Sequence, residues 1–281
     1  MSSSSGRLWI VATPLGNPGD LSPRANALLG TVDVILAEDT RRSGLLLATC
    51  GINAKRFVSL HDHNEKSRLP AILEELKAGA EAALVSDAGT PLISDPGYQL
   101  VKACREAGIP VSPVPGPSAP MAALSASGIA PLPFAFLGFP PRGKGDIRNF
   151  FKPYAALSVT LVFFERKDRL AATLDVAQEI LGKREGCIAR EMTKTYEEFI
   201  PFRLDEKTKQ LFAERELLGE ITVVLGPPLE SIVTDEADVL EVVRQKKDTC
   251  PDAKPREIAK QVQPEVSGWS VGDIYALLQK H

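Results

Sequence analysis

The chain has 281 residues, of which 44% are hydrophobic and 25% are charged, and its formal net charge is −3. Such a chain is long enough for two ordinary globular domains, and its charge excludes a global attraction to nucleic acid, so any polyanion must meet a locally basic surface. Four dispersed cysteines favour a reducing, cytoplasmic compartment over a disulfide framework or a zinc site. No run approaches the roughly 18 apolar residues of a membrane span, and residues 1–7 lack a signal core, so we expect neither export nor membrane insertion.

The first part of the chain repeats an order of strand, polar loop and helix. Short apolar runs predict strands at 8–12, 32–37, 56–60, 81–86 and 109–114. Helices are predicted between them, one of them beginning at the Ser22-Pro23 cap and another ending at Gly79. This alternation predicts a mostly parallel sheet covered on both faces, with ligand sites beyond the carboxyl ends of the strands. We assign residues 8–130 to this N-terminal α/β domain.

A segment rich in proline, glycine and aromatic residues, 131–145, marks the predicted domain junction. Beyond it, strands are expected at 158–164, 186–191 and 220–226, and helices at 167–181 and 203–216. These elements predict a second α/β domain over 131–228, which Pro227-Pro228 ends. Residues 233–281 show helical patterns only, including pieces at 237–245, 256–262 and 271–278, so the fold prediction is two α/β/α domains and a small C-terminal helical appendage.

Two loops that follow strands have the composition of a ligand site. Residues 13–20 combine two glycines and two prolines, which fix an exposed backbone path close to a ligand. Residues 87–90 follow the strand at 81–86 and place a carboxylate before three small residues. Either loop alone is as well explained as an ordinary connection, but two at the same sheet edge favour a binding site.

Several familiar motifs are absent or incomplete. No G-x-G-x-x-G follows a strand, and residues 138–145 resemble a phosphate-binding P-loop only until Gly145 stands where Ser or Thr would hold magnesium. Ser118 is better explained as a helix cap than as a nucleophile. His61 and His63 alternate in a loop without a third ligand, so no metal site is predicted.

Five loop motifs occur in order at residues 10–20, 37–41, 61–64, 85–97 and 114–119. Together they strongly resemble the RsmI family, the bacterial 16S rRNA cytidine 2'-O-methyltransferases of the tetrapyrrole-methylase-like class III type. The match covers most of residues 8–226. It implies a two-domain enzyme of the tetrapyrrole methylase type, a homodimer, with 16S rRNA in the small ribosomal subunit as substrate and S-adenosyl-L-methionine bound folded between the domains.

The resemblance also implies which residues contact the cofactor. They are Pro14, Asp87, Ala88, Gly89, Thr90, Leu92, Ile93, Ser118, Ala119, Phe164 and Gly226. One departure follows the strand at 158–164, where the family tends to carry Ser-Pro-His-Arg and this chain has residues 166–169, Arg-Lys-Asp-Arg. The departure replaces a turn by charged side chains.

Methyl transfer to a ribose hydroxyl needs alignment and benefits from a base, because a 2'-hydroxyl is a weak nucleophile near neutral pH. Asp39 is the first candidate because it ends a strand beside the expected cleft, and its equal alternative is an ion pair with Arg41 or Arg42. Glu38, Glu165 and Glu191 are the further candidates, and Arg41 or His63 would orient the substrate.

RNA requires local positive charge, which the sequence offers around the expected cleft. The predicted RNA-facing side chains are Arg41, His63, Arg142, Lys144, Arg166, Arg190 and Lys194. An ordinary solvated surface is the alternative for each of them. Two other functions stay open from the residues: a small-molecule, tetrapyrrole-type methyltransferase, and a non-catalytic ribosome-associated binding protein.

Overall fold

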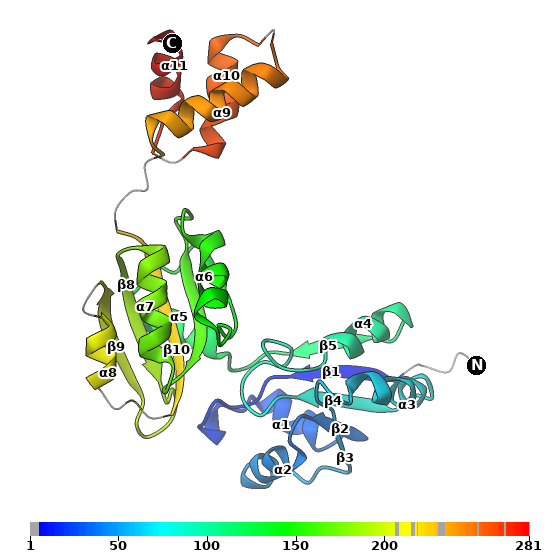
Figure 1. The fold of residues 1–281 in the computed structure, drawn as a ribbon. Coiled ribbons are helices and arrows are strands. Elements are labelled where there is room, and N and C mark those ends of the chain that lie inside the picture. Colours follow the sequence, from blue (N-terminus) through cyan, green and yellow to red (C-terminus); the bar gives the residue numbers. More distant parts are fainter. Residues whose placement is uncertain are drawn as a thin grey trace.

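The computed structural model describes residues 6–205, 208–214, 217, 219–229, 234–251, 253–266 and 268–280. Figure 1 shows two sheet-containing units next to each other and a helical unit on the far side of the second. Most of the polar N-terminal segment, residue 233 at the predicted start of the appendage, and Ser267 at its predicted break lie outside the described residues.

The first sheet is entirely parallel, as the sequence predicted. Its five strands lie in the order β3-β2-β4-β1-β5. Their bounds are β1 Arg7–Val11, β2 Val34–Ala37, β3 Phe57–Ser59, β4 Glu81–Val85 and β5 Val111–Val114. The loops after β4, β1 and β5 therefore leave the same edge of the sheet side by side.

Helices cover both faces of this sheet, because successive strand residues point to opposite sides. Ile35 packs with α1 (Pro23–Leu29) and α2 (Thr40–Thr49), whereas Leu36 packs with α3 (Glu65–Lys77) and α4 (Tyr98–Glu106). The sequence sets where these helices begin. The Ser22 hydroxyl accepts from the Ala25 N–H at 3.1 Å and caps α1.

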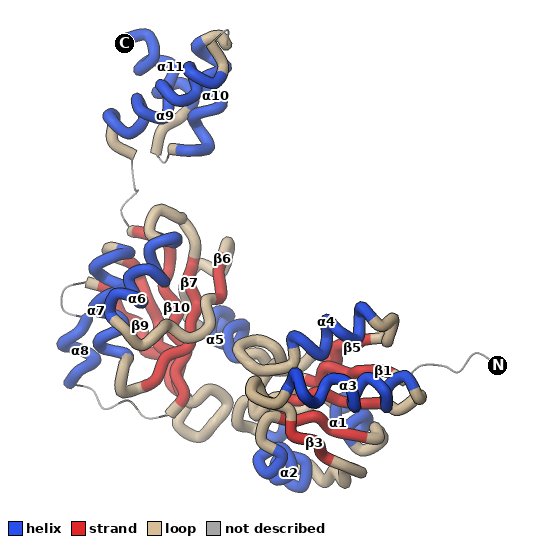
Figure 2. The backbone as a smooth tube through the Cα atoms, turned by 45° about the vertical axis from the view of Figure 1, so that its right-hand side comes forward, coloured by secondary structure: helices blue, strands red, loops and turns tan. Residues whose placement is uncertain are grey.

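The second sheet is mixed, in the order β6-β7-β10-β8-β9. Only β6 and β7 pair in parallel; the other neighbours are antiparallel. Its strands are β6 Phe134–Phe136, β7 Thr160–Arg166, β8 Arg184–Arg190, β9 Glu198–Leu204 and β10 Glu220–Pro228. On one face lie α6 (Lys144–Phe151), α7 (Leu170–Leu181) and α8 (Thr208–Glu214), as Figure 2 shows.

The opposite face of the second sheet is covered by α5 (Ala119–Ala126), which the sequence assigned to the first domain. Ala123 and Leu124 of α5 pack against Val162, Cys187 and Val224. By packing, the chain passes from one unit to the other before Ser118, rather than at residue 130. Sequence patterns place a helix along the chain but not the sheet on which it packs.

Four elements, β9, α8, β6 and α6, depart from the sequence prediction. Residues 198–204 form strand β9, so the helix expected at 203–216 is shortened to α8. The predicted junction 131–145 contains β6 and the first residues of α6. The strands β6 and β9 were hard to predict because prolines and glycines lie in or beside them. These residues are tolerated where a strand is short or lies at a sheet edge.

The C-terminal helices form a unit with its own apolar core. They are α9 Glu236–Thr249, α10 Pro255–Val262 and α11 Val271–Lys280, close to the helical pieces expected from the sequence. Val239, Ile258 and Ile274 are fully buried between them. Within the described part of the chain, no helix is long and apolar enough to cross a membrane.

Candidate cofactor cavity between the two sheets

A cavity of about 560 Å³ lies between the two sheet units. The first unit contributes Leu15 and residues 87–90 and 93–95, and residues 118–120 line it at the start of α5. The second sheet and its loops contribute Phe139, residues 164–168, Met192 and residues 219–222. The volume falls in the range of pockets for nucleotide-sized ligands. The ligand edge that the sequence predicted is one wall of this cavity.

Three loops of the first unit are tied together to form that wall. Thr13 and Gly89 exchange both backbone hydrogen bonds, at 2.9 and 3.0 Å, and the Thr90 hydroxyl donates to the Pro117 carbonyl at 3.0 Å. Gly89 has φ of +82°, and an added Cβ would lie 3.2 Å from Leu15. The loops after β1, β4 and β5 thus hold one another in place, and Gly89 is required by its backbone conformation.

Unusual backbone conformations flank the cavity on both sides. Among the described residues, the non-glycine positions with left-handed φ are Leu92 and Ser94 in the first unit and Glu191 and Thr193 in the second. Each such residue costs about 1–3 kcal/mol and is found where the surrounding structure enforces it, most often at functional sites. The two strained loops line opposite walls through Ile93 and Met192.

Asp87 presents an unsatisfied acceptor in the cavity wall. Its Oδ2 accepts from Arg42 Nη1 at 3.0 Å, but its Oδ1 is buried and has no hydrogen-bond partner among the described residues. A buried carboxylate oxygen without a donor is costly, so the site is suited to a ligand that brings a hydroxyl or amino group. The free Oδ1 of Asp87 could accept a hydrogen bond from a ribose hydroxyl or an amino group of S-adenosylmethionine.

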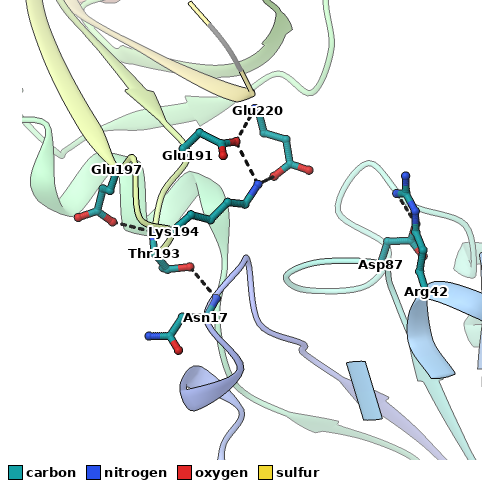
Figure 3. A network of polar contacts seen from close by, with 8 residues as sticks. All are labelled: Asn17, Arg42, Asp87, Glu191, Thr193, Lys194, Glu197 and Glu220. Carbon is teal, nitrogen blue, oxygen red and sulfur yellow. Dashed lines mark hydrogen bonds and ion pairs between the residues drawn. The ribbon is translucent and has the colours of Figure 1, made fainter. Parts of the chain in front are cut away.

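The two units also meet at the rim of the cavity (Figure 3). The Asn17 N–H donates to the Thr193 hydroxyl at 3.2 Å, and Lys194 Nζ contacts Glu191 at 3.0 Å and Glu220 at 3.2 Å. Partial burial alone would lower the pKa of Lys194, but the two carboxylates outweigh it and the pKa is raised. Lys194, which the sequence placed toward RNA, is instead neutralised inside this contact.

Glu191 is likewise occupied. Burial alone would raise its pKa, but hydrogen bonds from Lys194 and from the Glu220 N–H outweigh burial and lower it. A carboxylate held in its charged form by two donors is a weak proton acceptor. Glu191 therefore holds Lys194 and the start of β10 in place, and it is poorly suited to base catalysis.

Asp39, the first-ranked base of the sequence analysis, is the N-cap of α2. Its carboxylate accepts from the Arg41 N–H at 2.8 Å and the Arg42 N–H at 3.3 Å, which lowers its pKa. It does not line the cavity. The partners of the Asp39 carboxylate are thus the free amides of the helix N-terminus, whereas the sequence offered a base or an ion pair as equal alternatives. Most of the neighbouring Glu38 is exposed, and it also lies outside the lining. Its pKa is nevertheless raised, first by the partial desolvation of its carboxyl group and then by the negative charges of Asp87 and Asp62.

Asp95 is the carboxylate that the sequence analysis did not select. It lines the cavity next to the strained Ser94, and burial, followed by the nearby negative charge of Glu38, raises its pKa to about 6. A carboxylate with such a pKa is both ionised and more basic than usual at neutral pH. In the sequence, Asp95 precedes Pro96, and such an Asp-Pro pair is typical of the start of a helix. This structural explanation gave no reason to consider Asp95 as a base.

The predicted cofactor residues divide into three groups. Asp87, Ala88, Gly89, Thr90, Ile93, Ser118, Ala119 and Phe164 line the cavity. Pro14 and Leu92 lie directly beside lining residues but are not part of the lining. Gly226 is misplaced: its carbonyl accepts from Arg184 at 2.9 Å, and Thr222 is the β10 residue that pairs with Phe164. The antiparallel direction of β10 brings residues 220–222, rather than 226, to the cavity.

The predicted RNA-facing residues are only partly gathered at the cavity. Arg166 lines it and pairs with Asp168 at 3.3 Å, while Lys167 also lines it and has no ion pair in the described part of the chain. Arg190 pairs with Glu198 at 2.9 Å between β8 and β9. The remaining exposed positions are Arg41, His63, Arg142 and Lys144. No group of three or more possible metal ligands occurs among the described residues.

Comparison with known sequences supports the same family as the loop motifs. A model of the family described as Tetrapyrrole (Corrin/Porphyrin) Methylases matches residues 7–208. The ribosomal RNA small subunit methyltransferase I of Mycobacterium bovis is 44% identical over 256 residues, 89% of each chain. The protein of the same name from Thermotoga maritima is 48% identical over 221 residues, which cover 79% of this chain and 98% of that one.

Solved structures share the fold. The methyltransferase CobJ aligns with a TM-score of 0.59 and 20% identity over 79% of this chain and 95% of its own. The uroporphyrin-III C-methyltransferase of Thermus thermophilus, in complex with S-adenyl homocysteine, aligns with a TM-score of 0.56 and 22% identity over 79% and 97%. The predicted fold class is confirmed. With its two sheets, interlocked loops and central cavity, the chain belongs to the tetrapyrrole (corrin/porphyrin) methylase family, among the relatives named ribosomal RNA small subunit methyltransferase I.

Proposed function

We propose that this chain transfers a methyl group from S-adenosylmethionine to the 2'-hydroxyl of a cytidine in 16S ribosomal RNA. The observation that carries the proposal is the cavity between the sheets: it has the size for the cofactor, it includes most residues expected to contact it, and it presents the unsatisfied Asp87 oxygen. The relatives named ribosomal RNA small subunit methyltransferase I support the choice of substrate.

When bound, the cofactor supplies a methyl group that is already activated by a sulfonium sulfur. The tasks left to the chain are binding, orientation, exclusion of water and acceptance of one proton. Asp87 would accept hydrogen bonds from the cofactor, and the backbone at Gly89 allows close approach. Apolar side chains of the second wall, including Met192 and Ile221, exclude water from the opposite side.

Asp95 is the proposed proton acceptor for the ribose hydroxyl. It faces the cavity, and its raised pKa suits a group that must accept a proton near pH 7. We therefore rank it before Asp39, Glu38 and Glu191, each of which has another role or lies outside the lining.

Replacement of Asp87 by alanine is expected to weaken binding of S-adenosylhomocysteine about 10- to 150-fold, the value of a hydrogen bond to a charged group. Titration calorimetry measures this. The control is Arg42→Ala, because Arg42 is 73% exposed and its ion pair with Asp87 is worth about 1 kcal/mol or less. Equal binding by the Asp87 variant and the wild type would show that the orphaned oxygen does not serve the cofactor.

The homodimer, the cytoplasmic location and the assembled small subunit as substrate belong to the same proposal. The family resemblance implies the homodimer and the ribosomal substrate, and a ribosomal RNA substrate supports the cytoplasmic location. Light scattering of the purified chain tests the dimer. Comparison of naked 16S RNA with intact small subunits as methyl acceptors tests the form of the substrate.

The decisive experiment uses small ribosomal subunits from a strain that lacks this protein. The purified chain and radiolabelled S-adenosylmethionine are expected to label the 16S RNA, and mapping should place the product on the 2'-oxygen of a cytidine. A parallel reaction with uroporphyrinogen III tests a tetrapyrrole substrate. Label in the tetrapyrrole, with none in the subunits, would replace the proposal.

A further inference from the structure

An exposed aromatic ring stands at the mouth of the cavity. Phe139 lines the cavity, yet 54% of its surface is accessible. The ring rests on Phe164, with centroids 5.1 Å apart, and Phe164 in turn meets Phe136 at 5.0 Å. Large apolar groups left in water at a cavity mouth are typical of binding surfaces.

The backbone around Phe139 is held in place from two sides. The Phe164 N–H donates to the Gly138 carbonyl at 2.9 Å, which fixes the residue before the ring to β7. Arg169 Nη2 donates to the carbonyl of Pro140 at 3.0 Å and also to that of Pro141, which fixes the residues after it. The hydrogen bonds on both sides of the ring and the two prolines after it restrict the backbone of this loop. Little conformational entropy is therefore lost when a partner binds to the ring.

The anchor of this loop is itself buried. Glu165 follows Phe164, and its side chain is completely inaccessible. Its Oε2 accepts from the Thr173 hydroxyl at 2.5 Å and lies 3.4 Å from Arg169 Nη2. The pair positions the guanidinium that holds the loop, so Glu165 acts on the cavity through Arg169.

Two basic side chains belong to the same region as the ring, one through the cavity lining and one through the chain. Lys167 lines the same cavity without an ion pair in the described ranges, and Arg142 is exposed three residues after Phe139. A flat aromatic face beside unpaired cations is the arrangement by which proteins hold unpaired nucleotides, with the base stacked and the phosphates near the cations. Met192 and Ile221 are buried residues of the cavity wall and can provide apolar contacts to the cofactor. The exposed ring of Phe139 is therefore left for another ligand.

We propose that Phe139 is the platform on which the nucleobase of the target nucleotide stacks, so that its ribose is presented to the cavity. This inference rests on the proposed RNA methyltransferase function and names the residue that would orient its substrate. The predicted contact is between aromatic faces, so it depends on a ring at this position and not on apolar bulk alone.

The test measures methyl transfer to small subunits from a strain that lacks the protein, with Phe139→Ala, Phe139→Leu, Phe139→Trp and wild type. We expect kcat/KM for subunits to fall about 5- to 150-fold in the alanine variant, the range for loss of one stacked base. The leucine variant should stay low and the tryptophan variant should recover. Binding of S-adenosylhomocysteine should remain unchanged in all of them.

The control is Leu157→Ala, which removes another exposed apolar side chain, 46% accessible, outside the cavity. Thermal unfolding of each variant checks that the fold is kept. Wild-type kcat/KM in the alanine or leucine variant would overturn the stacking role, and weakened S-adenosylhomocysteine binding would assign the ring to the cofactor instead. A wild-type protein that does not methylate subunits would count against the proposed function itself.

Discussion

Replacement of Asp95 by asparagine is expected to lower the rate of methyl transfer about 10²- to 10⁴-fold while leaving S-adenosylhomocysteine binding intact, since this is the usual contribution of a positioned base. Single-turnover kinetics with saturating subunits isolates the chemical step. Because the pKa of Asp95 is about 6, the wild-type rate should fall as the pH drops below that value, when the carboxyl becomes protonated. The asparagine variant should lose this dependence.

The best control is Asp39→Asn. Asparagine caps helices as well as aspartate does, so the variant keeps α2 but removes the carboxylate. We expect a rate close to that of the wild type. The reverse outcome, a slow Asp39 variant and an unimpaired Asp95 variant, would return the base role to Asp39.

Stability separates a catalytic loss from a folding loss. A carboxyl whose folded pKa lies above its unfolded value binds its proton more tightly in the folded protein, so stability is lost as the pH rises from about 3.8 to about 6, and the full loss is present above about 6. The Asp95→Asn variant has no such charge, and its melting temperature at pH 8 should equal or exceed that of the wild type. Below the ordinary aspartate pKa of 3.8, where the carboxyl is protonated in both the folded and the unfolded protein, the difference should disappear.

Replacement of Arg184 by methionine is expected to destabilise the protein by about 3–5 kcal/mol. Arg184 has no accessible surface, and its guanidinium donates to the carbonyls of Val159 at 3.0 Å, Gly226 at 2.9 Å and Tyr154 at 3.2 Å. Burial lowers its pKa to about 10, which still leaves it charged. Methionine fills the space but leaves these buried acceptors without donors.

Urea unfolding measures this loss as a shift in midpoint. Arg148→Met is the matched control, because Arg148 forms an ion pair with Glu179 in solvent, and the unfolding midpoint of this variant should stay close to that of the wild type. If the Arg184 variant unfolded at the same urea concentration as the control, the carbonyl cluster would not depend on the guanidinium.

The sequence predicted the first unit well because its strands are short apolar runs bounded by loops. Strand β9 was missed because Pro201 argues against a strand, yet β9 is an edge strand, where a missing N–H costs little. Gly226 was assigned to the cofactor through the family resemblance alone, and the residue pattern contains no information on strand direction that could test the assignment. The antiparallel pairing with β7 brings Thr222 to that place instead.

Charged residues were the least predictable part of the site. Lys194 and Asp39 each had a plausible ligand role in the sequence, but each found a nearer partner in the fold: two glutamates for the lysine and two backbone amides for the aspartate. Asp95 acquires its altered basicity only from burial beside other acids. Such properties depend on tertiary neighbours, which residue spacing does not specify.

The position of α5 has a consequence for dividing the chain. A fragment that starts at residue 131 would leave Val162, Cys187 and Val224 bare on one side of the second sheet, and the complementary fragment would carry an orphaned apolar helix. Cutting before Pro115 keeps α5 with the sheet that it covers, but separates Ser118 and Ala119 from the first-unit loops with which they line the cavity. Neither fragment therefore keeps both a covered second sheet and a complete cavity wall.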